Sequence, residues 1–367
     1  MKVLHLGKFC PPNEGGIEVF VNDLLEYLNS KGVRADLLCF GNRTEENVYN
    51  GFKFHSCKTN LKFASAPLSM DFIKHFKKLV KKYDLIHIHS PNPVAEILSI
   101  FSSKPIIVHW HSDIVKQKIL YMFYKPFQQA FLKKARKIIC TSPQYLESSK
   151  QITNYKEKAI IIPSGLNPKR LTYNVSNTEF LKLKEKIKDK KIVLSVGRLV
   201  YYKGFKYLIK SAKFLPDDVV VVIGGSGPLY NELKKLVEKL DLKDKIFLTG
   251  KIKDTGIFIK NCDVFCLPSI ERAEAFGLVL VEALYYGKPL VTTEVYGSGM
   301  SYINKNGETG LVVPSKNPKA LAEAIIKILS NKKLYQKFSK NALKRFKEFK
   351  ISSIGNKIIN LYKEILE

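Results

Sequence analysis

Short apolar runs alternate with longer segments of helical period along most of the chain, and this alternation constrains the fold more than any other feature. A continuous Val/Ile/Leu run is typical of a strand buried on both faces, joined to its neighbours by crossover helices. The strands predicted in the first half are Lys2–Leu6, Ala35–Phe40, Leu85–His89, Ile106–His109, Lys137–Thr141 and Ala159–Ile162. Those predicted in the second half are Lys191–Val196, Val219–Ile223, Ile246–Thr249, Val264–Leu267, Leu290–Thr293 and Leu311–Val313. The pattern predicts an α/β fold with parallel sheets.

A change of composition separates the two series of strands. The stretch 163–191 is rich in turn-forming and charged residues. With 367 residues, the chain is long enough for two domains of ordinary size. Doubly wound domains bind ligands at the carboxyl ends of their strands, so we expect the functional site there.

The charge of the chain points to an anionic partner. Lys and Arg number 61 against 33 Asp and Glu, which gives a formal net charge of +28. Nucleic acid, anionic lipid and phosphorylated substrates all fit such a field. Nucleic-acid binding is the weaker alternative, because no helix-turn-helix, zinc-finger spacing or RNP-like aromatic run accompanies the charge. With no signal-peptide pattern and no apolar run of membrane-spanning length, we expect a cytoplasmic protein that is soluble or peripheral.

The cysteines give no sign of a metal or redox centre. They are Cys10, Cys39, Cys57, Cys140, Cys262 and Cys266, and only the last two form even a weak pair in sequence. We therefore expect buried free thiols in a reducing compartment.

Glycines follow two of the predicted strands. Gly15 and Gly16 open the first predicted helix, where free backbone N–H groups can face an anion, although a tight turn also favours glycine. Gly224, Gly225 and Gly227 follow a strand of the second half, but their spacing does not match the dinucleotide fingerprint. A nicotinamide enzyme is therefore disfavoured.

Two cations and two acids of the second half suggest a ligand with phosphate and hydroxyl groups. Arg198 and Lys203 lie just beyond a strand end, where they can clamp a diphosphate, although a solvated basic loop is the alternative. Glu274 falls in a loop, and Glu282 falls inside the helix that begins near Gly277. A carboxylate among apolar neighbours needs a hydroxyl or a cation to compensate its burial, and a polyhydroxylated ligand supplies hydroxyls.

An ordered set of motifs resembles the retaining glycosyltransferases of family four, in the bacterial branch that builds lipopolysaccharide, capsule or exopolysaccharide. In the second half the motifs are Ser195–Gly204, Gly225–Leu229, Glu274–Gly277 with Glu282, and Gly307–Pro314. In the first half they are Gly15–Glu18, His109–Asp113 and Ile162–Gly165. The resemblance therefore runs through nearly the whole chain.

The resemblance implies the GT-B fold: two facing Rossmann-like domains, with a C-terminal helix that crosses back to the first. The expected domains are 1–170 with 350–367, which would bind the acceptor, and 171–349, which would bind the nucleotide sugar. The implied activity is a hexosyltransferase that moves a hexose, with mannose as one candidate, from a GDP- or UDP-sugar to a lipid-linked or growing glycan. A catalytically silent scaffold of the same fold is the alternative.

The resemblance also implies roles for single residues. Arg198 and Lys203 would bind the donor diphosphate, Glu282 the ribose and Glu274 the hydroxyls of the transferred sugar. The remaining donor contacts would come from Gly16, Ile252, Phe276, Gly277, Leu278 and Val279. His111 falls where the family has a histidine beside the reacting sugar. His109 is the alternative to it, and a packed strand-end histidine is the alternative for both.

The implied chemistry needs neither a metal nor another cofactor. Negative charge grows on the leaving diphosphate, and cations with helix N–H groups stabilise it. The acceptor hydroxyl would attack from the face of the leaving group and retain the anomeric configuration.

Two basic segments of the first half could contact an anionic membrane. Residues 71–83 and 116–137 both combine lysines with apolar or aromatic side chains. A core-packed helix with a solvated lysine face is the alternative reading. A polyprenyl-linked acceptor would fit a peripheral protein on the inner face of the cell membrane.

Overall fold

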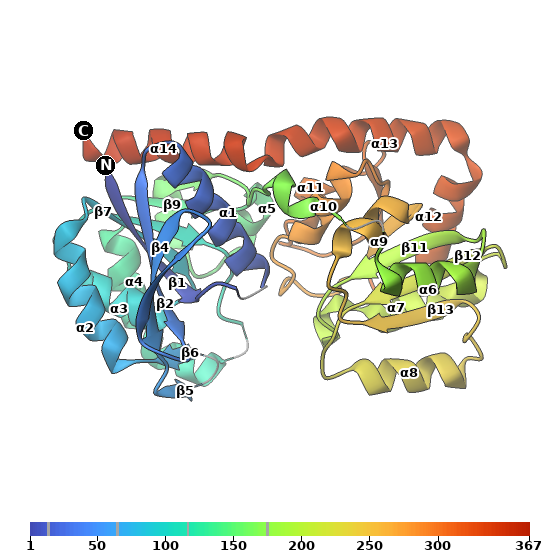
Figure 1. Ribbon diagram of the computed structural model, residues 1–367, viewed down its shortest axis with the longest axis horizontal. Coiled ribbons are helices and arrows are strands. Elements are labelled where there is room, and N and C mark those ends of the chain that lie inside the picture. Colours follow the sequence, from blue (N-terminus) through green and yellow to red (C-terminus); the bar gives the residue numbers. More distant parts are fainter. Residues whose placement is uncertain (13–14, 64–65, 116, 174–175) are drawn as a thin grey trace. The chain divides into compact units, whose positions relative to one another are not determined.

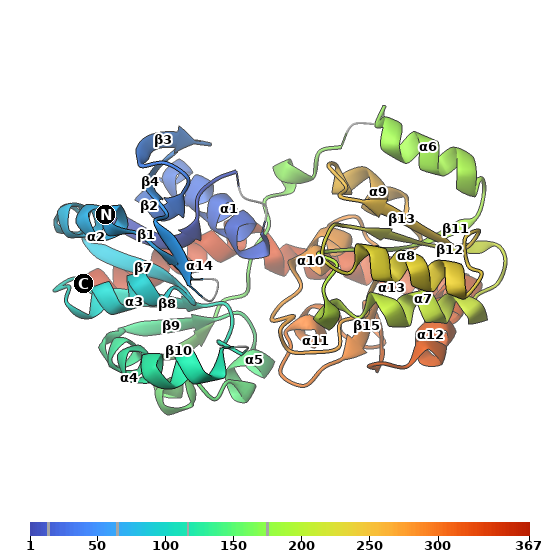
Figure 2. The same ribbon diagram turned by 90° about the horizontal axis from the view of Figure 1, so that it is seen from below.

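The chain folds into two compact units, shown in Figures 1 and 2. The computed structural model describes residues 1–12, 15–63, 66–115, 117–173 and 176–367. The first unit contains Met1–Leu166 and Lys350–Glu367, and the second contains Asn167–Phe349. Residues 167–170, which the sequence places in the first domain, belong to the second unit, where Arg170 forms an ion pair with Glu282.

The first unit is built on an eight-stranded sheet with the order β10-β9-β8-β7-β1-β2-β4-β3. Its strands are β1 (Lys2–Phe9), β2 (Arg34–Gly41), β3 (Glu45–Tyr49), β4 (Phe52–Lys58), β7 (Leu85–Ser90), β8 (Ile106–Trp110), β9 (Lys137–Cys140) and β10 (Ala159–Ile161). All neighbours pair in parallel except β3 and β4. The antiparallel strands β5 (Leu61–Phe63) and β6 (Ala66–Leu68) form a separate two-stranded sheet.

The second unit contains a six-stranded parallel sheet with the order β13-β12-β11-β14-β15-β16. Its strands are β11 (Lys191–Val196), β12 (Val219–Gly224), β13 (Ile246–Gly250), β14 (Val264–Leu267), β15 (Leu290–Glu294) and β16 (Gly310–Pro314). Chain order reverses between β11 and β14, so the loops after these two strands leave the carboxyl edge in opposite directions, and in doubly wound sheets the crevice at such a switch point is where ligands bind.

Helices cover both sheets. Those of the first unit are α1 (Gly16–Ser30), α2 (Met70–Leu79), α3 (Pro93–Ile100), α4 (Lys118–Lys134), α5 (Pro143–Ser148) and α14 (Ile351–Leu366). Those of the second are α6 (Thr178–Ile187), α7 (Phe205–Ser211), α8 (Tyr230–Lys239), α9 (Thr255–Asn261), α10 (Leu278–Tyr285), α11 (Met300–Ile303), α12 (Pro318–Ser330) and α13 (Lys332–Phe346). Side-chain caps begin several of them; Asn317, for example, accepts a hydrogen bond from the N–H of Ala320.

The last helix belongs to the first unit, as the sequence predicts. Ile354, Ile358 and Leu361 of α14 are buried, and Gly355 lets the helix approach Tyr27 of α1 so closely that a Cβ would stand 2.2 Å from the Tyr27 ring. The expected α/β fold with parallel sheets is confirmed. The strands β3, β4, β5 and β6 are not among those predicted from the sequence. In β4, His55 and Ser56 interrupt the apolar pattern.

The two basic segments differ in what their apolar side chains contact. On α2, Phe72, Phe76 and Leu79 are buried in the first unit, so the core-packed alternative holds for that helix. On α4, Met122 and Phe123 are 72% and 76% exposed. Lys116, at the start of the second segment, lies outside the described residues. In the parts of the chain that the structure describes, no helix is long and apolar enough to cross a bilayer.

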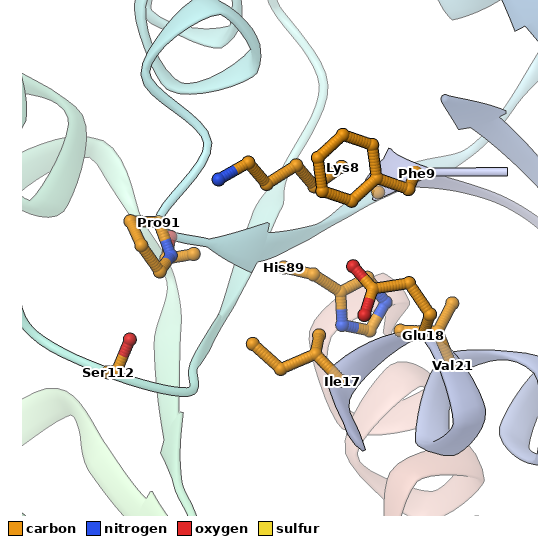
Figure 3. A pocket seen from close by; sticks show the side chains of 10 residues that line it. Lys8, Phe9, Ile17, Glu18, Val21, His89, Pro91 and Ser112 are labelled. Carbon is orange, nitrogen blue, oxygen red and sulfur yellow. The ribbon is translucent and has the colours of Figure 1, made fainter. Parts of the chain in front are cut away.

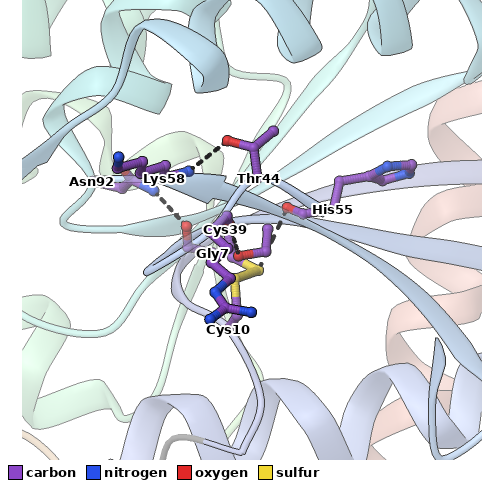
Figure 4. The surroundings of a disulfide bond; sticks show 9 residues. Gly7, Cys10, Cys39, Thr44, His55, Lys58 and Asn92 are labelled. Atoms are coloured by element: carbon purple, nitrogen blue, oxygen red, sulfur yellow. Dashed lines mark hydrogen bonds between the residues drawn. A yellow bond between two sulfur atoms is a disulfide. The ribbon is translucent and has the colours of Figure 1, made fainter. Parts of the chain in front are cut away.

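A disulfide joins Cys10 to Cys39, with Cα atoms 5.3 Å apart (Figure 4). The expectation of free thiols is therefore wrong for this pair, because the parallel register of β1 and β2 brings together two residues that are 29 positions apart. Cys57, Cys140, Cys262 and Cys266 are free and buried, as the sequence analysis predicts.

Reducing this disulfide should lower the free energy of unfolding. Closing a loop of this length restricts the unfolded chain by an amount worth about 3–4 kcal/mol in the chain-entropy model. Urea titrations with and without reductant measure the difference. The double variant Cys10→Ala/Cys39→Ala is the control, since its stability should not respond to reductant. An equal response of the two proteins would contradict the prediction.

Candidate functional site

The crevice of the second unit receives one loop from β11 and one from β14. Arg198 and Lys203 follow β11, and Glu274 follows β14. These strands are neighbours in the sheet, with Val193 opposite Val264, so loops that are far apart in sequence start side by side.

Lys203 and Glu274 form a buried ion pair in this crevice. The Lys203 Nζ lies 2.5 Å from Oε2 of Glu274, and their side chains are only 10% and 9% exposed. Ser269 Oγ donates a hydrogen bond of 3.1 Å to the same carboxylate oxygen. Burial lowers the pKa of Lys203, but Glu274 and Tyr202 raise it more, so the pKa lies above that of an ordinary lysine. The lysine is therefore a permanent cation at neutral pH.

Glycines make room for this pair. A Cβ on Gly197 would stand 3.2 Å from Cε of Lys203, so the absence of one lets the lysine side chain pass along the strand end. Gly204 has a positive φ of 68° and lies against the carbonyl of Pro268, where a Cβ would be only 2.1 Å from the oxygen. The β11 loop thereby contacts the β14 loop, and Ile270 N–H bonds the Tyr202 carbonyl at 2.7 Å.

Arg198 contrasts with Lys203, because it is exposed. Among the described residues, no carboxylate forms an ion pair with its guanidinium. Its backbone is fixed nonetheless: Gly197 N–H bonds the Gly224 carbonyl and Leu199 N–H bonds the Ser226 carbonyl, each at 2.9 Å. The structure thus presents a guanidinium to solvent from a rigid loop beside a buried ammonium.

The loop that carries Glu274 leads directly into α10. Gly277 caps the helix with φ of 88°, and no side chain caps the first N–H groups. The Glu274 carbonyl accepts a hydrogen bond from Ser298 Oγ, and Gly299 N–H bonds the Ala275 carbonyl at 2.8 Å. Of the remaining predicted residues of this segment, Phe276 is buried, and Leu278 and Val279 are half-buried. Free helix N–H groups therefore lie within a few residues of the buried ion pair.

Glu282 lies inside α10, where it is buried. Burial raises the pKa of this carboxyl, while Arg170, whose Nη2 is 3.1 Å from Oε1, acts in the opposite direction. Sequence reasoning missed Arg170 as the partner, because it precedes Glu282 by 112 positions and belongs to no motif. Ile252 is also buried, and its side chain covers Gly224 so closely that a Cβ there would overlap it.

The first unit contains a pocket of about 160 Å³ where β1 and β7 end (Figure 3). Lys8, Glu18, His89 and Ser112 are among its lining residues. Burial lowers the pKa of Lys8 and raises that of Glu18, and the attraction between the two opposes both shifts. Gly16 begins α1 nearby, is exposed, and has no described atom within 4 Å of the place a Cβ would occupy. Packing therefore gives no reason for glycine at this position.

His111 and His109 belong to a buried group of five histidines, with His5, His87 and His89. Two triplets, His5/His87/His89 and His89/His109/His111, have ring nitrogens within 4.8 Å of one another, the spacing of a metal site. Most of these nitrogens, however, form hydrogen bonds to one another. Sequence reasoning did not group these residues, although the alternation His87-Ile88-His89 and His109-Trp110-His111 is a period-2 signal that places each pair on one face of a strand.

Asp113 holds the loop that follows His111. Its Oδ1 accepts hydrogen bonds from Trp110 Nε1 at 2.9 Å and from Ser149 Oγ at 2.6 Å. The His111 N–H bonds the Ser90 carbonyl at 3.1 Å, which ties this loop to the end of β7. His111 is therefore held in place from both sides.

Two family models match the chain, one for each unit. Residues 14–170 match the model described as Glycosyltransferase Family 4, and residues 177–345 match the one described as Glycosyl transferases group 1. The chain is 32% identical to the O-antigen chain mannosyltransferase C of Escherichia coli, over 100% of this chain and 99% of that protein. It is also 32% identical to the D-rhamnosyltransferase WbpZ of Pseudomonas aeruginosa, over 95% and 92% of the two chains.

Solved structures resemble the whole chain. Anabaena Alr3699/HepE in complex with UDP superposes with a TM-score of 0.82 at 19% identity, covering 99% of this chain and 100% of that one. The sucrose-phosphate synthase of Thermosynechococcus elongatus gives a TM-score of 0.78 at 22% identity, covering 100% and 99%. At these identities the likeness concerns the fold alone, which is GT-B.

Breaking the buried pair from one side should cost much more stability than removing both charges. Lys203→Met leaves Glu274 buried without its cation and should lower the free energy of unfolding by about 3–5 kcal/mol. Adding Glu274→Gln to that variant should restore most of the loss. Denaturant titration without ligand measures both. Lys210→Met, an exposed change on α7, is the control and should shift stability by less than about 0.5 kcal/mol. A double variant no more stable than Lys203→Met would show that the two charges do not interact.

Proposed function

The chain belongs to glycosyltransferase family 4, and on this premise we propose that it transfers a hexose from a nucleoside-diphosphate sugar to a hydroxyl of a growing cell-surface glycan, with retention of anomeric configuration. The relatives that match over nearly their whole length, a mannosyltransferase and a D-rhamnosyltransferase, support mannose or a closely related sugar. GDP- and UDP-sugars are the candidate donors. Nucleic-acid binding is not favoured, since full-length relatives are glycosyltransferases.

The proposal rests on two cations at the crevice of the second unit, of which Lys203 is buried and Arg198 is exposed. The Lys203 ammonium is already neutralised by Glu274, whereas Arg198 has no carboxylate partner among the described residues. A diphosphate placed between them would gain a charge-assisted bond from Arg198 and accept further bonds from the first N–H groups of α10. Glu274 would then accept hydrogen bonds from sugar hydroxyls while it keeps its contact with Lys203.

These groups suit a reaction in which charge develops on the leaving group. As the bond between sugar C1 and the diphosphate oxygen breaks, the electron pair stays on the diphosphate and the ring becomes cationic. Fixed cations and N–H groups stabilise that diphosphate more in the transition state than in the ground state. The acceptor oxygen bonds to C1, and its proton passes to the departing phosphate oxygen. Arg198 supplies the net positive charge and the Lys203 ammonium supplies further N–H donors, so the proposed reaction uses no metal or other cofactor.

The remaining residues take roles around the donor. Glu282, whose pKa is raised by burial, would accept hydrogen bonds from the ribose. Backbone groups at Ile252 would contact the base, since the buried side chain is directed into the protein. Gly16 at the start of α1 would allow a phosphate to approach, and His111 would contact the reacting sugar.

We place the membrane contact on α4. Its exposed apolar residues include Ile119, Met122, Phe123 and Phe127, and the exposed Lys125 and Lys133 lie on the same helix. With a net charge of +28, the chain favours an anionic bilayer as the partner of this face. The acceptor would then be a polyprenyl-linked glycan on the cytoplasmic side.

Arg198→Ala should lower kcat for transfer from GDP-mannose or UDP-glucose by roughly 100- to 1000-fold, the usual effect of losing one group that stabilises transition-state charge. Its melting temperature should stay unchanged, because the side chain is exposed. Lys203 is a less clean test, since its burial with Glu274 means that Lys203→Ala also costs stability.

The control is Lys210→Ala, which removes an exposed cation outside the crevice. Melting curves with GDP-, UDP-, ADP- and dTDP-sugars identify the donor first, because a ligand bound by the native state raises the melting temperature. Near-normal transfer by Arg198→Ala would remove the diphosphate assignment.

The variant Met122→Gln/Phe123→Gln should weaken binding to anionic vesicles by at least about tenfold, since each side chain loses apolar burial in the bilayer. Flotation measures the effect. Wild-type binding should fall at high salt, because the lysine contribution is screened. Phe214→Gln, an equally drastic change at an exposed phenylalanine of the second unit, should have no effect. Equal binding to neutral vesicles would count against the membrane contact.

A further inference from the structure

The pocket of the first unit lies at the point where chain order reverses in its sheet. From β1 the chain continues to β2 on one side, whereas β7, β8, β9 and β10 follow on the other side. In doubly wound sheets, ligands bind outside the carboxyl ends of the strands at such a switch point. The pocket stands where β1 and β7 end, so it has the position of a ligand site built from residues of this unit.

Two opposite charges face this pocket without meeting. Lys8 lies near the end of β1, and Glu18 lies in the first turn of α1. Figure 3 shows the Lys8 ammonium and the Glu18 carboxylate on different sides of one space, which the Ser112 hydroxyl also faces. Among the described residues, no ion pair joins Lys8 to Glu18. The space between the two charges is therefore available to a ligand.

Both charges are partly removed from water. Burial lowers the pKa of Lys8 and raises that of Glu18, and the attraction between the two opposes both shifts. A charge in such a place is unfavourable unless hydrogen bonds compensate its lost hydration. A ligand that bonds to both groups would compensate both charges.

The Glu18 carboxylate is held in position by the start of α1. Glu18 stands three residues after the N-cap residue Gly15, the position from which a glutamate folds back over a helix start. A Cβ on Gly15 would stand 2.1 Å from Glu18 Oε2, so glycine makes room for the carboxylate. An ionised carboxylate has about four lone-pair sites, so this helix-capping position leaves sites for a ligand.

Apolar side chains form much of the remaining wall. They are Phe9, Ile17, Val21 and Pro91, and the Lys8 Nζ lies 5.4 Å from the centroid of the Phe9 ring. Ligand sites commonly combine such apolar walls with a few well-placed polar groups. A sugar ring has the matching surface, because C–H groups cover its faces and hydroxyls surround its rim.

The charges in the pocket favour a neutral ligand. An anionic group beside Lys8 would also face the Glu18 carboxylate, and a cationic group beside Glu18 would also face the Lys8 ammonium. A hydroxyl avoids both repulsions, because it can donate to a carboxylate and accept from an ammonium. The pocket volume of about 160 Å³ is that of roughly five water molecules in the liquid, which suits one sugar ring rather than a chain of them.

We propose that this pocket binds one neutral sugar ring, the terminal ring of the glycan acceptor, with Glu18 accepting hydrogen bonds from its hydroxyls and Lys8 donating hydrogen bonds to them. The assignment to the acceptor rests on the proposed function, in which Glu274 of the second unit takes the sugar of the donor. The binding of a sugar ring depends on the first unit alone.

Binding of a free sugar tests the site without turnover. Methyl α-D-mannopyranoside and methyl α-D-glucopyranoside are titrated into the isoleucine-methyl-labelled protein without nucleotide, and loss of one NMR signal in Ile17→Val identifies Ile17. At least one glycoside should shift the Ile17 signal at millimolar concentration, since Ile17 is the one isoleucine among the described lining residues. An unshifted Ile17 signal with both glycosides would overturn the proposal. A shift caused by GDP-mannose or UDP-glucose but by neither glycoside would also overturn it, because the ring would then belong to the donor.

Variants of the two charged residues test their roles. Glu18→Gln and Lys8→Met should each weaken binding of the glycoside by about tenfold, because hydrogen bonds to charged groups are stronger than those to neutral ones. The matched controls are Glu26→Gln, further along α1, and Lys2→Met, at the other end of β1, which should leave binding unchanged. Unchanged binding in folded Glu18→Gln and Lys8→Met would overturn the proposal.

Turnover separates this inference from the proposed function. Glu18→Gln and Lys8→Met should raise KM for the acceptor glycan by about tenfold and leave KM for the donor sugar unchanged. A raised KM for the donor with an unchanged KM for the acceptor would overturn the assignment to the acceptor. A wild-type protein that is inactive with every donor but shows the Ile17 shift would instead contradict the proposed function and support the sugar site.

Discussion

The buried contact between Lys203 and Glu274 is the interaction on which the site of the second unit depends. Two opposite charges removed from water are stable only while each keeps the other and its hydrogen bonds. The lysine comes from the loop after β11 and the glutamate from the loop after β14, so the pair fixes one loop against the other. Gly204 is required for the same reason, since a Cβ there would overlap the Pro268 carbonyl of the other loop, and a Cβ on Gly197 would crowd the Lys203 side chain. The buried pair is thus held in place and carries no net charge, and the exposed Arg198 is the cation that remains available to bind an anion.

The buried polar groups of the first unit also need partners, but these groups are neutral. Its interior contains five imidazoles and a phenol, and almost every nitrogen is paired, because an unpaired polar group in an apolar core is costly. Such a network has few permitted proton arrangements. Hydrogen bonds through His89 and His5 connect His111 at the strand ends to Tyr362 of α14. In both units, then, side chains at the strand ends are held by buried partners from other segments of the chain.

Much of this could be predicted from local patterns. Apolar runs located all twelve predicted strands, and motifs located Arg198, Lys203 and Glu274. The failures have physical causes. The strand β4 contains polar residues that only its place in the sheet explains, and the Cys10–Cys39 disulfide depends on the register of β1 and β2. Arg170 was missed, since a partner more than a hundred positions away leaves no local signal.

By itself the sequence determined the parallel α/β fold, the two halves of the chain and the family, because hydrophobic periodicity and ordered motifs are properties of neighbouring residues. Only the tertiary structure decided which of two basic helices exposes apolar side chains, which cysteines are bonded, and how His111 is connected to Tyr362. These outcomes depend on which segments a sheet places side by side. Pairing between distant strands and helices is chosen by the burial of the whole core, so no local stretch of sequence contains it.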